Sequence, residues 1–150
     1  MAFQTIETIT LLDTDRVAQF KITGVANAVW NTNATVIQAN TLRFANASMP
    51  INRLTVTSVQ YSTDAAANGF IGLYYVGATN TAIYNFGSSD DGAFDAYIPN
   101  TTGAGVTGDI GIIVQNFQPA NTFNFIITVA KDNEADPGRG AWANAFTFQN

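Results

Sequence analysis

The residues best suited to chemistry in this chain are its carboxylates, because the sequence contains neither histidine nor cysteine. That composition excludes cysteine nucleophiles, histidine general bases, Ser-His-Asp triads, disulfides and the usual zinc sites. Catalysis would have to rest on Asp and Glu, on Lys21 or Lys131, or on hydroxyl groups. We therefore predict that the protein is not an enzyme, with no catalytic, cofactor-binding or metal-binding residues.

Three short acidic clusters could supply oxygen ligands to calcium, or a carboxylate pair for glycoside hydrolysis. They are Asp13/Asp15, Asp90/Asp91/Asp95 and Asp132/Glu134/Asp136. None has the spacing of an EF-hand loop, and a β protein with eleven acidic residues brings some pair together by chance. We interpret the clusters as solvated turns, with calcium binding and a carboxylate glycosidase as alternatives.

The run Gly103-Ala-Gly105-Val-Thr-Gly108 matches the dinucleotide-binding pattern G-x-G-x-x-G. That pattern holds a pyrophosphate only where a strand precedes it and a helix follows it. Here the residues that follow, 109–114, have the β-branched composition of a strand. The run therefore predicts a loop with positive φ at its glycines and not a cofactor site.

Aromatic side chains offer a different chemistry, the stacking of sugar rings. The candidates for such a platform are Trp30, Tyr61, Tyr74, Tyr75, Tyr84 and Tyr97. Aromatic residues of this kind more often belong to a core or to a contact between subunits. A glycan-binding module is nevertheless the main alternative to a structural protein.

Charge and hydropathy argue against nucleic-acid and membrane partners. The six basic residues are scattered, so no stripe could neutralise several phosphates, and the net charge is −5. The first 15 residues lack a basic segment and carry Glu7 within their apolar run, so we expect no signal peptide. The longest apolar stretch, residues 71–78, is too short to span a bilayer.

Short β-strands must position all of these residues, because no apolar period of 3.6 persists and turn residues recur every eight to twelve positions. We predict strands over residues 16–23, 35–39, 51–61, 70–76, 81–86 and 93–98. The apolar face changes near Ser58, which indicates either a bulge or a strand that passes from the core to an interface. Residues 103–131 form the last hairpin, turning at 118–121. Its two strands bury one face each, with residues Ile110, Ile112 and Val114, and Phe123, Phe125, Ile127 and Val129.

The predicted fold class is all-β: a single-domain antiparallel β-sandwich of jelly-roll type with extended N- and C-terminal segments. An open barrel is the alternative. Residues 1–15 form an N-terminal arm or edge strand, residues 16–131 the sandwich and residues 132–150 a C-terminal extension. Only 11% of residues are charged, against roughly 25% in most soluble domains, which suits surfaces that face other proteins.

Apolar residues near both ends of the chain are candidates for contacts between subunits. The N-terminal arm carries Phe3, Ile6 and Ile9, and the C-terminal extension carries Trp142, Phe146 and Phe148. Terminal segments are usually polar unless they dock on something. We expect these six residues to form an interface.

The middle of the chain, roughly residues 20–131, resembles small structural proteins of tailed bacteriophages, particularly marine and cyanobacterial phages. The most specific run is Ala104-Gly-Val-Thr-Gly-Asp-Ile110, which follows Asn100. Weaker matches fall in the same order as in the family: Gly24-Val-Ala-Asn-Ala-Val-Trp30, Ala34-Thr-Val-Ile37, Val59-Gln-Tyr-Ser62, Leu73-Tyr-Tyr75 and Phe125-Ile-Ile-Thr-Val-Ala-Lys131.

This resemblance implies a virion component without enzymatic activity, most specifically a capsid decoration or cement protein that bridges capsomers. The partners that we expect are the major capsid protein and other copies of the chain itself, as a homo-oligomer, most specifically a trimer, on the capsid surface. The family pattern ends near the residue matched by Lys131, whereas this chain continues for nineteen residues beyond it. A receptor- or glycan-binding module of a tail or head fibre is the alternative.

Overall fold

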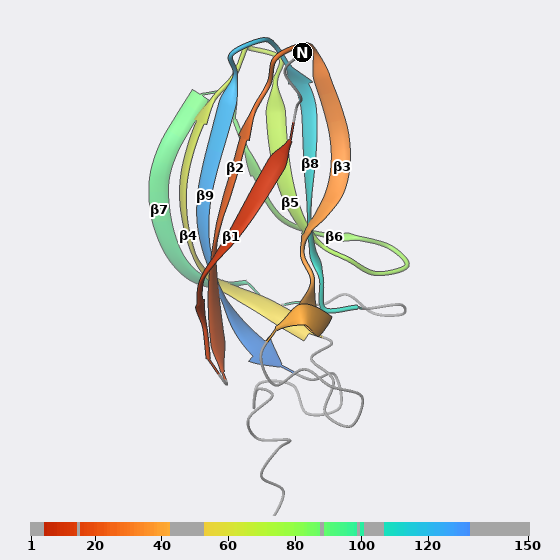
Figure 1. Ribbon diagram of the computed structural model, residues 1–150, viewed down its shortest axis with the longest axis vertical. Helices are drawn as coiled ribbons and strands as arrows, with labels where there is room; N and C mark the ends of the chain where they lie inside the picture. Colours follow the sequence, from red (N-terminus) through yellow and green to blue (C-terminus); the bar gives the residue numbers. More distant parts are fainter. Residues whose placement is uncertain are drawn as a thin grey trace, which may run out of the picture.

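Nine β-strands and one turn of 3-10 helix make up the secondary structure of the computed structural model, which describes residues 5–14, 16–42, 53–87, 89–98, 100 and 107–132 (Figure 1). The elements are β1 (Ile6–Asp13), β2 (Val17–Val25), β3 (Trp30–Ile37), η1 (Ala39–Thr41), β4 (Arg53–Asp64), β5 (Phe70–Tyr75), β6 (Thr81–Phe86), β7 (Ser89–Ile98), β8 (Ile110–Phe117) and β9 (Thr122–Asp132). The fold is all-β, as the sequence predicts.

The strands form two antiparallel sheets that pack face to face as two layers (Figure 1). One sheet has five strands in the order β1-β2-β9-β4-β7, and the other has four in the order β3-β8-β5-β6. From β2 onward the strands pair first with last, as β2–β9, β3–β8, β4–β7 and β5–β6. This nesting is the jelly roll, so the predicted sandwich is confirmed and the open barrel is not observed.

The core follows the period of two in the last hairpin. Phe123, Phe125, Ile127 and Val129 of β9 are buried, while the residues between them are not. On the neighbouring strand β2, Ile22 lies opposite Phe125, and both are fully buried. Each fully buried side chain of this size contributes about 1.5–3 kcal/mol. A slip of one residue would expose this whole row, which is why the register is well defined.

Strand β4 contains a bulge, which is one of the two explanations that the sequence offers for the change of apolar face near Ser58. Val56 and Val59 are both buried although they are three positions apart, which strict alternation forbids. The register shifts between Val56 and Ser58 against both neighbours, β7 and β9. Against β9 the extra residue is Thr57, which returns the apolar positions of the second half of β4 to the core.

Two predicted boundaries are wrong because Asn, Asp and Gly are weak signals for strands. We predicted a strand that begins only at residue 35, but β3 begins at Trp30 and alternates, with Asn31 and Asn33 exposed. We also predicted a strand that begins only at residue 93, whereas β7 begins at Ser89 and pairs with β4. In both cases pairing with a neighbouring strand overrides local propensity.

Candidate interaction surfaces

The described residues contain no cluster of three or more acidic residues that could hold a metal ion. Asp90, Asp91 and Asp95 lie along β7 as exposed side chains, in a strand and not in a turn. Asp13 forms an ion pair with Lys131. The other members of the predicted clusters, Asp15, Glu134 and Asp136, lie outside the described residues, and the side chain of Asp132 is not described.

The positive φ predicted for the glycine-rich run is confirmed at its last glycine, Gly108. Gly108 has φ 84°, the left-handed conformation that favours glycine, and β8 follows it directly. Gly103 and Gly105 lie outside the described residues. Because a strand and not a helix follows the run, it lacks the helix N-terminus that a pyrophosphate site needs. The described chain also includes no helix that is long and apolar enough to cross a membrane.

Strand β1 is the most exposed apolar element of the sandwich. It forms an edge of the five-stranded sheet and is paired with β2, and its six central residues are exposed on both faces. Ile9, Leu11 and Leu12 have exposed fractions of 44%, 47% and 47%. A register shift between Thr10 and Leu12 makes Leu11 the extra residue of a bulge. An exposed apolar edge of this kind is a template for pairing with another chain.

The predicted interface residues are only partly placed by the structure. Ile9 is exposed, whereas Ile6 is partly buried and packs against the core. Phe3, Trp142, Phe146 and Phe148 lie outside the described residues. Leu11 and Leu12 were not predicted as interface residues, because the sequence does not show that both faces of β1 are exposed.

The turn that joins β1 to β2 is held to β9 by a buried cation. The Lys131 ammonium donates to the carboxylate of Asp13 and to the carbonyl of Thr14, and the Lys131 side chain is fully buried. The Lys131 amide donates to the carbonyl of Arg16 at 2.8 Å. These contacts fix where the exposed strand leaves the sandwich.

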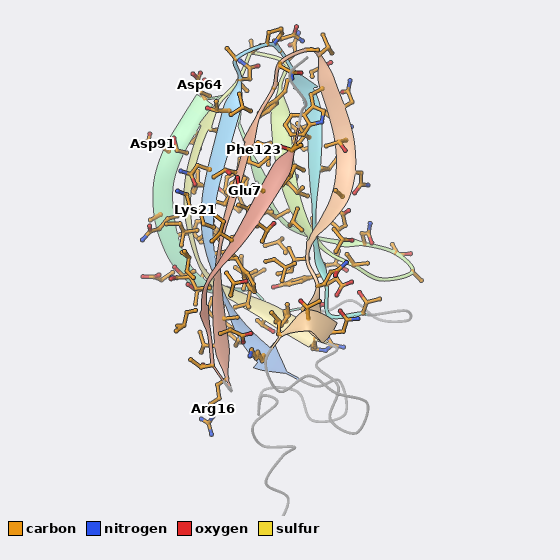
Figure 2. All side chains as sticks on the ribbon, viewed as in Figure 1. Glu7, Arg16, Lys21, Asp64, Asp91 and Phe123 are labelled. Atoms are coloured by element: carbon orange, nitrogen blue, oxygen red, sulfur yellow. The ribbon has the colours of Figure 1, made fainter. Side chains whose placement is uncertain are left out.

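The second candidate surface is the outer face of the four-stranded sheet, which carries no charge. None of the residues in β3, β5, β6 and β8 is acidic or basic. The charged residues of the described strands all belong to the five-stranded sheet. Figure 2 labels four of them, Glu7, Lys21, Asp64 and Asp91, together with Arg16 in the turn between β1 and β2. The two sheets therefore present chemically different outer faces.

Amide and apolar side chains alternate across this uncharged face. One row crosses all four strands, with Asn33 opposite Ile113, Ile113 opposite Gly72, and Gly72 opposite Asn85. An open depression of about 300 Å³ lies over β3 and β8, lined by Asn31, Thr32, Asn33, Ile113, Val114 and Gln115. Beside it, the Tyr74 ring lies across Gly111, and its hydroxyl donates to the side-chain oxygen of Asn33. Partial burial raises the pKa of Tyr74.

The six aromatic residues considered as a sugar platform do not lie together. Trp30 and Tyr75 are buried in the core, and Tyr97 is exposed on β7. Tyr61 and Tyr84 both pack on Phe86, with ring centroids 4.7 and 4.9 Å from it, where β6 and β7 close one side of the sandwich. Only Tyr74 lies on the uncharged face. A single concave aromatic platform is therefore not formed.

Comparison with known proteins adds no functional assignment. No model of a known protein family matches the chain, and no curated protein is significantly similar to it.

Proposed function

We propose that the protein is a structural component of a tailed-bacteriophage virion, a decoration or cement protein on the capsid surface that stabilises the head by bridging capsomers. The sequence resemblance over residues 20–131 suggests this role. The jelly-roll fold is compatible with it, since viral coat proteins use that fold among others. The partners are the major capsid protein and other copies of this chain, most specifically in a trimer.

The observation that best supports the proposal is the exposure of β1 on both faces. A fifth strand added to the edge of a jelly roll buries little apolar surface of its own, yet it carries Ile9, Leu11 and Leu12. A soluble monomer protects such an edge with charges, proline or a cover. Pairing with an adjacent subunit would bury the three side chains and satisfy the free backbone groups of the strand.

Self-association through β1 can be tested with the variant I9D/L12D. We expect the full-length wild-type protein to be trimeric by light scattering after size exclusion, and the variant to be monomeric with an unchanged far-UV circular dichroism spectrum. The matched control is A93D/Y97D on β7, the opposite edge of the same sheet, which should remain trimeric. A wild-type protein that stays monomeric at micromolar concentration would contradict self-association through β1.

The virion role itself needs localisation. Antibodies against the purified protein, applied to phage particles that encode it, should label the capsid surface in electron micrographs. Labelling confined to the tail, or a protein that is absent from purified particles, would overturn the assignment to the capsid.

A further inference from the structure

We propose that the uncharged outer face of the four-stranded sheet binds a neutral saccharide, at a site formed by Asn31, Asn33, Ile113, Gln115 and Tyr74. This function goes beyond the structural role and uses another surface, since β1 belongs to the other sheet. The proposal rests on hydrogen-bond donors with fixed orientation, an apolar floor beneath them, and the absence of charge.

The two asparagines of β3 have their amide groups oriented by hydrogen bonds. The side-chain oxygen of Asn31 accepts a hydrogen bond from the backbone N–H of Asn116 at 2.9 Å. Because this group can only donate, the atom of Asn31 that faces it is the oxygen and not the nitrogen. The side-chain oxygen of Asn33 accepts from the Tyr74 hydroxyl. Both amide nitrogens make no hydrogen bond within the described part of the chain, so both remain as donors for a ligand. Two exposed donors whose orientation is already fixed bind with a smaller entropy cost.

The surface between and beside these donors is apolar. Ile113 lies opposite Asn33 on β8, and its side chain lines the depression together with the exposed amide of Gln115. The Tyr74 side chain crosses Gly111 so closely that a Cβ at position 111 would overlap its ring and hydroxyl group. An aromatic ring held across a strand presents a surface for the C–H face of a pyranose, while the amides bind its hydroxyl groups.

The absence of charge selects the kind of ligand. A phosphate, sulfate or sialic acid is bound more strongly where a cation faces it, and the four strands of this sheet supply none. The depression is ringed by three amide side chains, those of Asn31, Asn33 and Gln115, which can pair with the hydroxyl groups of an uncharged ligand. Its volume of about 300 Å³ suits one or two sugar rings.

Binding can be tested with the full-length protein on an array of neutral and anionic glycans, followed by titration of neutral tetrasaccharides of glucose, mannose, galactose and N-acetylglucosamine. Side-chain amide signals of Asn31, Asn33 and Gln115 should shift in NMR spectra. N33A should weaken binding roughly fivefold, because one hydrogen bond to a neutral group is lost. G111A should also weaken it, since the new methyl group displaces the Tyr74 ring. The matched control is N124A, an exposed asparagine on β9 of the other sheet.

The outcomes separate this site from the virion role. Binding of neutral glycans that falls in N33A and G111A but not in N124A supports the site, whatever the oligomeric state of I9D/L12D. No binding to any neutral glycan at millimolar concentration overturns it. Equal effects of N33A and N124A, or a preference for anionic glycans, would also overturn the proposal. An oligomer that N33A alone dissociates would overturn it as well, because the face would then be a contact between copies of the chain. Melting temperatures verify that each variant is folded.

Discussion

At the scale of single residues, Tyr75 shows how a buried polar group joins the two sheets. Its side chain lies in β5, on the four-stranded sheet, and is fully buried. Its hydroxyl accepts from the Val56 amide at 2.9 Å and donates to the Ile98 carbonyl at 2.7 Å, both in the five-stranded sheet. Val56 and Ile98 adjoin the register shift between β4 and β7. Tyr75 therefore satisfies backbone groups at the place where the bulge disrupts the ladder.

Replacing Tyr75 by phenylalanine should lower the free energy of unfolding at pH 7 by about 1–3 kcal/mol, because two buried backbone groups lose their partner. Urea titrations measure this loss. Y97F is the control, since Tyr97 is exposed on β7, and it should leave stability unchanged. Equal stability of wild type and Y75F at pH 7 would mean that water replaces the hydroxyl.

The same residue predicts a pH dependence. Burial raises the pKa of Tyr75 to about 12, from an ordinary value of 10.0. Above pH 10 the unfolded chain releases the phenolic proton while the folded chain retains it, so the unfolded state is favoured as the pH rises. The stabilisation is complete below pH 10 and declines towards pH 12, by about 2–3 kcal/mol in total. The stability advantage of wild type over Y75F should therefore shrink between pH 10 and 12.

At the scale of elements, the β1–β2 hairpin depends on one buried lysine in β9. The Lys131 side chain is fully buried, whereas the Asp13 side chain is 23% exposed. Removing one member of such an ion pair leaves the charge of the other member buried without compensation. The resulting loss in folding free energy is larger when the remaining charge is the more buried one. The hairpin carries the exposed edge strand, so this ion pair links the stability of the core to the position of the candidate interface.

D13N should therefore destabilise the protein by about 2–4 kcal/mol, since it leaves the ammonium group buried without its carboxylate. K131M should cost less, because an apolar side chain of similar length fills the same space and Asp13 retains contact with solvent. Chemical denaturation ranks the two variants, and hydrogen exchange of the β1 amides shows whether the hairpin loosens first. A larger loss for K131M than for D13N would contradict this account.

At the scale of the whole molecule, the nine strands that the structure describes end at or before Asp132. The last of them, β9, lies between β2 and β4 in the centre of the five-stranded sheet and must remain intact. We expect a chain that ends after Asp132 to retain the sandwich. It would lose three of the six residues that the sequence predicts at an interface, namely Trp142, Phe146 and Phe148. The proposed virion role then predicts weaker binding to capsids.

That truncation can be measured directly. The shortened and full-length proteins should have melting temperatures within a few degrees of each other, and their occupancy on capsids should differ at least several-fold. Unchanged occupancy would contradict a role for the C-terminal extension in docking. Loss of cooperative unfolding would show instead that the extension belongs to the sandwich.

The sequence by itself determined the fold class and the core of the last hairpin. Period-two alternation in residues such as Phe123, Phe125, Ile127 and Val129 depends only on the geometry of a strand. The change of apolar face near Ser58 left two alternatives, a bulge or a strand that passes to an interface, and the register of β4 against β9 decided for the bulge. Exposure of Ile9 was also predictable, since neither face of its strand is uniformly apolar.

Tertiary structure decided which residues share a surface. Asn31 and Asn33 resembled a loop in the sequence, because asparagine has low β-propensity, and pairing with β8 made them neighbours of Ile113 and Gln115. Tyr74 and Tyr75 are adjacent in sequence, yet the pleat sends one to the uncharged outer face and the other into the core. Such neighbourhoods arise from strand order and register, which local sequence patterns do not encode.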